Sequence, residues 1–443
     1  MTNPKIGFLM LGHRDYPNEI GERMADRAVE QLIESGIEIR RAPSPALEPW
    51  QAVNAARELL DSRVDGVILF LDTWLEAQVA IAAVRELEHL PLLVWGFPMF
   101  EKDGRRESTG SAVVYTVIKG ALDRVGLPHE GVWGNVDDPK ALDRVRIFAR
   151  AAHARRRLQQ TRIGLVGYAS MGMYSGTFDH LLMRFRIGPE IEHADSYSII
   201  RRIEAIEKKR CAPVIARLRK RARIMDGVTE DHLQTVVRIY LALKDWAGER
   251  HLDAICFKCQ YEFSQEYGMV GCVPLALLAS DGIVAACEGD IPLIVSMIIQ
   301  RYLTGQAIPY GDVLDRVDNR LLFSSCGFAP FETASSPEDI EIRPAILPYF
   351  KGVTNSFVLK PGPVTVLRLS EGIGSYRLTY GTGTGLPTER RQGWAPALEV
   401  ELDGDADDFL AQVTTQHYSI AYGDLSREIE SLARMLRVDV LRV

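Results

Sequence analysis

Side chains that could perform acid–base chemistry or hold a metal ion gather in one stretch, residues 255–291. Lys258 and Glu262 follow one apolar run, and Glu288 and Asp290 follow a second. The interval between Glu262 and Asp290 leaves room for a helix, at about 272–281, that joins two adjacent parallel strands. We therefore expect these carboxylates to converge at one edge of a sheet.

Converging carboxylates repel one another, and either a shared proton or a bound cation relieves the repulsion. Oxygen-rich sites with one or two imidazoles suit Mn²⁺, Mg²⁺ and related ions. Once histidines on expected helix surfaces and in polar turns are set aside, the remaining candidates are His13, His180, His193 and His417. His417 begins a strand-like run that leads into a helix, so its ring can lie at the edge of a domain. A structural histidine held by hydrogen bonds is the alternative interpretation.

Alternating apolar runs and helical patterns predict the elements that position these residues. The first domain should contain strands at 5–11, 64–71 and 91–95 and helices at 19–35 and 75–87, and the pattern restarts at 161 and reaches a strand at 252–258. Such alternation predicts parallel sheets with helices on both faces. After about residue 335, prolines punctuate short β-prone runs, until a final helix at about 425–436.

The expected fold class is therefore α/β, with two tandem doubly wound parallel-sheet domains followed by a mainly β C-terminal domain. A chain of 443 residues is too long for one core, since cores stop growing near ~250 to 300 residues. We predict an N-terminal Rossmann-like domain at 1–158, a second α/β domain with the acidic residues at 159–335, and a mainly β domain with His417 at 336–443.

The amino-acid composition indicates a globular protein and argues against nucleic-acid and membrane partners. The apolar fraction of 47% and the charged fraction of 25% are those of an ordinary globular protein, and the net charge of -7 argues against a nucleic-acid partner. No apolar run reaches the roughly 20 residues needed to cross a bilayer, and no secretory signal is recognisable, so we expect a cytoplasmic protein without a membrane partner. The six cysteines are expected to be free thiols, because they are scattered along the chain and four of them lie in apolar or strand-like runs. The Cys256–Cys259 pair has no second pair at zinc-ribbon spacing, which argues against a structural zinc there.

A glycine-containing loop follows the strand at 161. Gly167, Gly172 and Gly176 match neither the G-x-G-x-x-G pattern nor a P-loop, which argues against a dinucleotide cofactor. The loop should instead lie at the carboxyl end of a strand, where open α/β sheets bind their ligands. Met173, in this loop, is a candidate contact to a substrate.

Three separated motifs occur in order: K-C-x-x-E (258–262), C-E-G-D (287–290) and H-Y-x-x-x-Y-G-D (417–424), supported by GMYSGTFD (172–179), SCGFAPF (325–331) and GPVTVLRL (362–369). Together they resemble the signatures of the L-fucose/L-arabinose isomerase-like family, over essentially the whole chain. The resemblance implies an aldose–ketose isomerase that assembles as a homo-hexamer. It also implies a divalent ion, Mn²⁺ or alternatively Co²⁺ or Mg²⁺, held by Glu262, Asp290 and His417.

The same resemblance assigns the acid–base work to Glu262 and Asp290. Isomerisation through a cis-enediol needs a base that moves a proton between neighbouring carbons, while a metal that chelates both oxygens stabilises the developing oxyanion. Glu266 and Glu288 are the substitutes if the motif is aligned differently.

Other residues bear on the substrate. Ser325 stands where much of the family has histidine before Cys-Gly, and Lys258 and Glu288 are further expected substrate contacts. Arg14, in a polar loop after the first strand, would suit an anionic substrate, a sulfonated hexose such as sulfoquinovose or a phosphorylated hexose. Trp74 is a candidate for stacking on a sugar face, with core packing as the alternative.

Two other functions stay open at this point. A non-catalytic sugar-binding or regulatory protein would also contain tandem doubly wound units, although it would not need carboxylates around an ion. A metal-dependent aldolase or hydrolase would use the same carboxylate–imidazole site.

Overall fold

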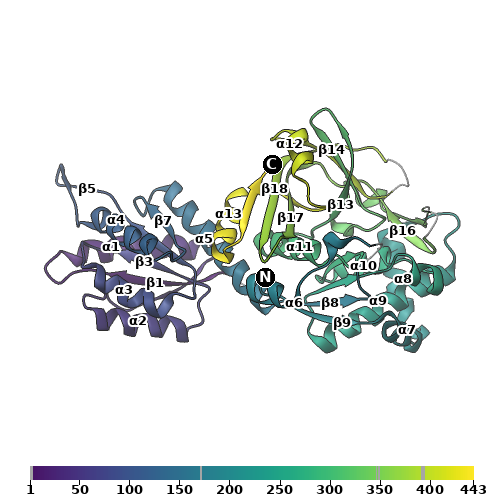
Figure 1. Ribbon diagram of the computed structural model, residues 1–443, viewed down its shortest axis with the longest axis horizontal. Helices are drawn as coiled ribbons and strands as arrows, with labels where there is room; N and C mark the ends of the chain where they lie inside the picture. The colour runs from purple at the N-terminus through teal and green to yellow at the C-terminus, as the bar shows by residue number, and fades with distance from the viewer. Residues whose placement is uncertain (1–2, 170–171, 346, 348–349, 391–394) are drawn as a thin grey trace. The chain divides into compact units, whose positions relative to one another are not determined.

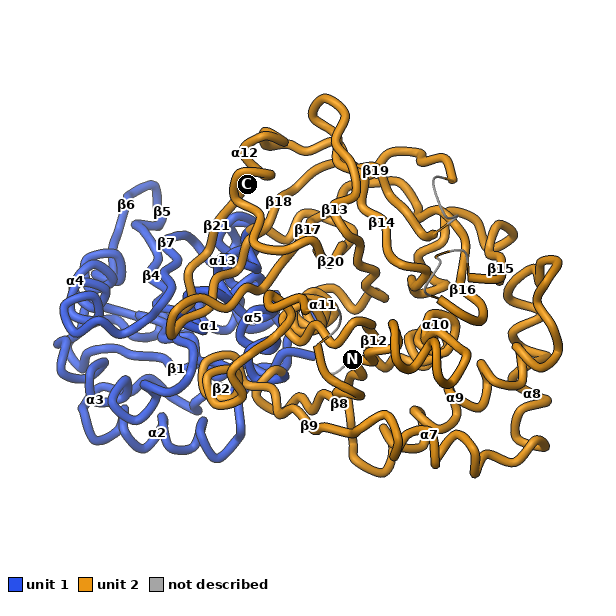
Figure 2. The backbone as a smooth tube through the Cα atoms, turned by 45° about the vertical axis from the view of Figure 1, so that its right-hand side comes forward, with its two compact units in different colours: residues 1–157, 427–437 blue, residues 158–426, 438–443 orange. Residues whose placement is uncertain are grey.

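A computed structural model describes residues 3–169, 172–345, 347, 350–390 and 395–443 (Figure 1). The chain is mixed α/β, as the alternating pattern predicts. It divides into two compact units, unit 1 with residues 1–157 and 427–437 and unit 2 with residues 158–426 and 438–443 (Figure 2). The first division falls inside the long helix α5 (Pro139–Gln160). The division into three domains stays a prediction.

Unit 1 is built on a parallel sheet in the order β2-β1-β3-β4-β7. Its strands are β1 (Lys5–Leu11), β2 (Glu38–Arg41), β3 (Gly66–Leu71), β4 (Leu92–Gly96) and β7 (Glu130–Trp133). The strands expected at 5–11, 64–71 and 91–95 are thus confirmed as β1, β3 and β4. A separate hairpin consists of β5 (Phe100–Lys102) and β6 (Arg105–Glu107).

Helices cover both faces of this sheet. They are α1 (Asn18–Glu34), α2 (Pro49–Asp61), α3 (Ala77–Leu87), α4 (Ser111–Arg124), α5 and most of α13 (Ser426–Leu436). Leu9 and Leu11 of β1 belong to a buried cluster with α2, α3 and α4, whereas Phe8 and Met10 belong to one with α1 and α5. Successive strand residues point to opposite faces, so a sheet covered on both sides needs an uninterrupted apolar run.

Unit 2 begins with a parallel sheet in the order β12-β11-β8-β9. Its strands are β8 (Arg162–Val166), β9 (Glu190–Ala194), β11 (Ala254–Phe257) and β12 (Val284–Cys287), and its longer helices are α7 (Ser196–Ala205), α8 (Lys208–Arg221), α9 (Glu230–Arg250), α10 (Cys272–Ser280) and α11 (Ile291–Thr304). Helix α10 joins β11 to its parallel neighbour β12, as expected for 272–281. A small sheet contains β10 (Arg223–Ile224), β15 (Glu341–Pro344) and β16 (Val353–Ser356).

The remaining strands of unit 2 close into a barrel in the order β17-β20-β13-β14-β19-β18, because β17 also pairs with β18. They are β13 (Tyr310–Val317), β14 (Arg320–Ser324), β17 (Gly362–Glu371), β18 (Tyr376–Leu386), β19 (Ala397–Leu402) and β20 (His417–Tyr422). These pairings are antiparallel, and β21 (Asp439–Arg442) adds to β18 in parallel. Strands β13 and β14 precede residue 336, and the short helix α12 (Ala406–Gln412) follows β19.

Helix α11 packs against β17 and β20 of the barrel, and it lies beside β17 in Figure 1. This packing brings the N-terminus of α11 to two barrel strands that carry buried polar side chains. Among the residues that the structure describes, no helix is both long and apolar enough to cross a membrane.

Candidate functional site

The acidic residues of β12 and α11 lie where the strand-end argument placed them. In the parallel pair β11–β12, Phe257 is opposite Cys287, so both strands end at the same edge. Asp290 caps α11, and one of its carboxylate oxygens accepts a hydrogen bond from the backbone N–H of Leu293 at 2.9 Å. The cap fixes the side chain at the start of the helix.

Asp290 joins two side chains of the barrel. Its Oδ2 accepts a hydrogen bond from Arg368 of β17 at 2.8 Å and lies 2.9 Å from His417 Nδ1 of β20. Arg368 also donates to the backbone oxygen of Ser175 at 2.8 Å. A Cβ at Gly176 would come within 3.3 Å of the Asp290 Cα, so a small residue lets this loop lie against the helix. Four segments distant in sequence thus meet at one carboxylate.

Charge partners determine the protonation of this pair. Burial opposes the charged form of Asp290, but Arg368 and His417 outweigh it and lower the pKa of the carboxyl. Burial also opposes the charged form of His417, but Glu288, Asp290 and Asp312 outweigh it and raise the pKa of the imidazole. The buried residues form a network of paired charges.

Glu288 lies in the turn between β12 and α11. Its φ is +72°, and the adjacent Gly289 has a φ of +71° at a point where a Cβ would collide with the carbonyl oxygen of Tyr168. Such strained backbone is found preferentially at functional sites. The turn directs Glu288 Oε2 to within 3.3 Å of His417 Nε2.

Burial raises the pKa of Glu288 to about 7, although His417 opposes the rise. A carboxyl that titrates near neutrality is suited to proton transfer. From the sequence alone, Glu288 is expected only as a substrate contact and as a substitute ligand.

The structure places Glu262 in different surroundings. Its carboxylate forms an ion pair with Lys258 at 2.7 Å, and 72% of its side chain is exposed. The hydrogen bond from Lys258 lowers the pKa of Glu262. In the described part of the chain, Glu262 contacts neither Asp290 nor His417, so the structure brings together two of the three predicted ligands. The substitute Glu266 is also exposed.

The donors around His417 fit a divalent ion. His417 Nε2 is buried without a hydrogen-bond partner among the described residues, and it lies 3.3 Å from an oxygen of Glu288 and 3.3 Å from an oxygen of Asp312. Adjacent ligand atoms in an octahedral shell with bonds of about 2.1 Å lie roughly 3 Å apart. On the other ring nitrogen, Asp290 occupies the position of a carboxylate that orients a metal-binding histidine.

The predicted substrate contacts have separate surroundings. In unit 2, the hydroxyl of buried Ser325 donates to the carbonyl of Phe328, and Met173 contacts the side-chain amide of Gln416. In unit 1, Arg14 pairs with Glu48 at 2.9 Å, and Trp74 packs against His13 and Tyr16. Roles in substrate binding stay predictions for all of these residues.

Of the other candidate histidines, His180 and His193 contact each other, with their Nε2 atoms 2.6 Å apart.

Arg368 and Asp312 were not foreseen from the sequence. Arg368 is the one charged residue in the run GPVTVLRLS, and a charge in an otherwise apolar strand needs a buried partner. That signal pointed to a carboxylate but not to Asp290. Asp312 follows Tyr310 and Gly311 in β13, and no comparable signal distinguishes it.

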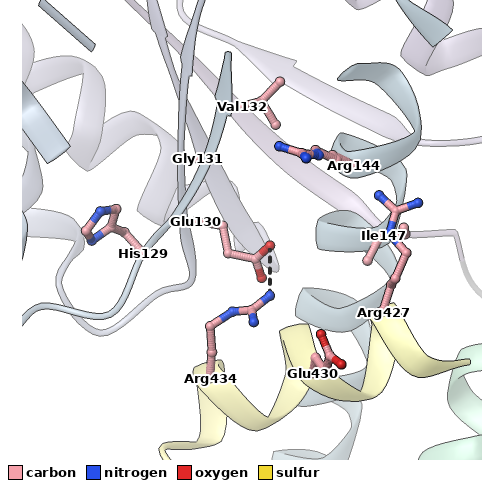
Figure 3. Close-up of a pocket in the computed structure, with 9 residues that line it drawn as sticks. All are labelled: His129, Glu130, Gly131, Val132, Arg144, Ile147, Arg427, Glu430 and Arg434. Carbon is pink, nitrogen blue, oxygen red and sulfur yellow. Dashed lines mark ion pairs between the residues drawn. The ribbon is translucent and has the colours of Figure 1, made fainter. Parts of the chain in front are cut away.

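A separate pocket lies wholly within unit 1 (Figure 3). It has a volume of about 290 Å³, and its lining includes Glu130, Arg144, Arg427 and Arg434. Glu130 pairs with Arg434 at 3.7 Å, and Arg427 pairs with Asp143. The pocket contains none of the predicted site residues.

Comparisons with known proteins give a consistent result along the whole chain. No family model matches. The chain is 22% identical over 447 residues to a sulfoquinovose isomerase of Alkalicoccus urumqiensis, with 98% of each chain covered. It is 23% identical over 457 residues to that of Priestia aryabhattai and 24% over 450 residues to that of Clostridium sp. (strain MSTE9), with 99% of each chain covered.

Solved structures add nothing to this comparison. A periplasmic solute binding protein of Actinobacillus succinogenes 130z with bound D-allose is 11% identical, with 69% of this chain and 94% of that chain covered. Its TM-score of 0.20 is too low to support an argument about fold or function.

Proposed function

We propose that this protein is an aldose–ketose isomerase that interconverts sulfoquinovose, a sulfonated aldohexose, and the corresponding ketose. The observation that carries the proposal is the similarity over 98% or more of the chain to proteins named sulfoquinovose isomerase. The alternative of a sulfonated rather than a neutral substrate, which the sequence raised through Arg14, thereby gains support. A phosphorylated hexose has no such support.

The buried network supplies groups suited to this chemistry. Isomerisation requires a group that removes a proton from C2 of the aldose and returns one to C1. We assign this transfer to Glu288, because it is buried next to His417 Nε2 and, without a bound ion, burial raises its pKa to about 7. Asp290 is held ionised by Arg368 and His417, so we assign it the positioning of the imidazole.

A divalent ion, Mn²⁺ or alternatively Co²⁺ or Mg²⁺, is part of the proposal. When bound, it would supply positive charge that stabilises the oxyanion developing between C1 and C2. The donors that support it are His417 Nε2 and the carboxylates of Glu288 and Asp312 that face this atom. Glu262 and Asp290, which the family resemblance implies as ligands together with His417, remain the alternative to Glu288 and Asp312.

Turnover of sulfoquinovose by the purified full chain tests this proposal. The protein is incubated with sulfoquinovose and Mn²⁺, and ¹³C NMR is used to detect a ketose that keeps all the carbons of the substrate. Glucose and glucose 6-phosphate serve as neutral and phosphorylated controls. We expect ketose from sulfoquinovose, loss of turnover with a chelator, and recovery when the ion is restored. Absence of ketose with Mn²⁺, Co²⁺ and Mg²⁺ from a folded protein would overturn the proposal.

A further inference from the structure

We propose that thiols next to Glu288 form a second metal site, one for a soft ion of the Zn²⁺ class. This thiol cluster comprises Cys259, Cys272, Cys287 and Cys326 of unit 2, and it adjoins the oxygen-rich surroundings of His417 Nε2 through Glu288, which faces both. The inference goes beyond the proposed function and does not depend on the identity of the sugar.

The sulfur atoms contact one another in a chain. Cys287 Sγ lies 3.3 Å from Cys326 Sγ, and Cys326 in turn contacts the thiol of Cys272. Cys259 contacts Cys287 from the other side. One carboxylate oxygen of Glu288 and the sulfurs of Cys287 and Cys326 all lie within 4.8 Å of one another. These atoms form a compact donor set.

Four parts of unit 2 bring the thiols together. Cys259 follows β11 and Cys287 ends its neighbour β12, whereas Cys272 begins the helix between these strands. Cys326 follows β14 of the barrel and is succeeded by Gly327, whose φ is +130°. A Cβ at Gly327 would lie 3.2 Å from Cys272 Sγ, so glycine lets this turn approach the helix closely.

The donors match a tetrahedral soft ion. Bonds of about 2.3 Å from Zn²⁺ to sulfur place two ligand sulfurs roughly 3.8 Å apart, so Cys287 and Cys326 need to separate by only about 0.5 Å. Cys287, Cys326 and Glu288 would supply three ligands, and Cys272, which contacts Cys326, is the nearest further thiol. Thiolates favour such ions over Mn²⁺ or Mg²⁺, which prefer oxygen ligands. The two sites therefore differ in the ion that they select.

Cys326 is the one partly exposed residue of the cluster, and Cys259, Cys272 and Cys287 are buried. Binding would engage Glu288, which faces His417 and to which we assign the proton transfer. Occupancy of the cluster should therefore inhibit turnover. Cys211 of α8 provides the matched control. It is buried and contacts the backbone oxygen of Glu207, and it lies outside the cluster.

Titration of the full chain with Cd²⁺, in the presence of Mn²⁺, tests the site directly. Cadmium bound to thiolates absorbs in the ultraviolet by charge transfer, a signal that oxygen and imidazole ligands do not produce. We expect one Cd²⁺ per chain with this absorption, at least tenfold weaker binding in Cys326→Ser and Cys287→Ser, and no change in Cys211→Ser. Circular dichroism checks that each variant folds. Equal absorption and affinity in Cys326→Ser and Cys211→Ser would overturn the proposal.

A second measurement avoids substitutions. The unmodified chain is treated with iodoacetamide with and without Zn²⁺, and alkylation of Cys326 is measured by mass spectrometry. We expect Zn²⁺ to slow alkylation at least tenfold, and equal rates would contradict the site. The Cd²⁺ absorption and the alkylation of Cys326 both report on thiols and not on turnover. Either result can therefore be obtained whether or not the protein isomerises sulfoquinovose.

Discussion

Two buried aspartates, one in each unit, have opposite surroundings. Asp72 follows β3 in unit 1, and neither of its carboxylate oxygens has a hydrogen-bond partner among the residues described. Burial raises its pKa well above the ordinary value, and nearby Glu22 adds to the rise. Asp290 is equally buried in unit 2, yet Arg368 and His417 lower its pKa. Burial therefore favours the neutral carboxyl, and only a buried cation reverses that preference.

The two units therefore differ in how they hold a buried carboxyl group. In unit 2, Asp290, Arg368 and His417 hold one another in place and present Glu288 and Asp312 to a ring nitrogen. In unit 1, Asp72 has no such partner set. Substitutions at Asp290, Glu288, Asp72 and Glu262 are expected to change the free energy of unfolding by successively smaller amounts.

Asp290→Asn should have the largest effect. Asparagine still caps α11, but it leaves Arg368 buried without its counter-charge, which should cost about 3–5 kcal/mol of stability. Turnover of sulfoquinovose should fall below detection, because the imidazole loses its orienting partner. Urea unfolding measures the loss of stability, and initial rates measure the loss of turnover. Wild-type values of both would show that neither the fold nor the activity depends on the charge of Asp290.

Glu288→Gln should lower the rate of turnover strongly and change how the stability of the protein depends on pH. We expect kcat to fall about 10²- to 10⁴-fold, the usual contribution of a proton-transfer group. The folded-state pKa of about 7 exceeds the ordinary value of 4.5, so the contribution of Glu288 to stability is full below pH 4.5 and is lost as the pH rises to about 7. This change, on the order of 3 kcal/mol, should be absent in the variant. The same pH profile in both proteins would rule out the raised pKa.

Asp72→Asn should change only the pH dependence of unit 1. Because the folded-state pKa is raised, the wild-type carboxyl favours folding at pH values below its ordinary pKa, and that contribution is lost as the pH rises through the folded-state value. The loss amounts to about 1.4 kcal/mol for each pH unit of the shift. Thermal unfolding from acidic to alkaline pH should therefore show a shallower decline for the variant, and a steeper one would contradict the unpaired state of Asp72.

Glu262→Gln should alter stability least, by less than about 0.5 kcal/mol, because the side chain of Glu262 is largely exposed where it pairs with Lys258. If Glu262 is a ligand, as the resemblance implies, turnover should nevertheless be lost and bound Mn²⁺ should fall. Metal analysis after gel filtration provides the check. Retention of both would leave His417, Glu288 and Asp312 as the proposed ligand set.

Much of the fold was predictable because it depends on local pattern. Uninterrupted apolar runs such as that of β1 predicted sheets covered on both faces, and strand ends located Glu288 and Asp290. The closure of the barrel was not predictable, since β17 pairs with β18 and β20 through contacts that no local pattern specifies. All six cysteines are free thiols, as expected, but their convergence depends on the same distant pairings.

The site was predictable only in part for a related reason. The position of Glu262 after β11 was foreseen, but its direction follows from an ion pair with Lys258, four residues earlier. The partner of Arg368 lies in a different part of unit 2, so an isolated charge in a strand indicated a buried pair without naming its other member. The pKa of Glu288 depends on its burial and on His417 in the barrel, which the sequence does not place beside it.

Proton exchange in deuterated water tests the central claim most directly. Sulfoquinovose is incubated with the Mn²⁺-loaded protein in D₂O, and ¹H NMR follows the hydrogen at C2 while the carbon skeleton is monitored. If Glu288 transfers the proton, the C2 signal should disappear as aldose and ketose equilibrate. Glu288→Gln should then slow this exchange together with turnover. Cleavage of a carbon–carbon bond, or a C2 signal that is retained in the presence of folded, metal-loaded protein, would contradict it.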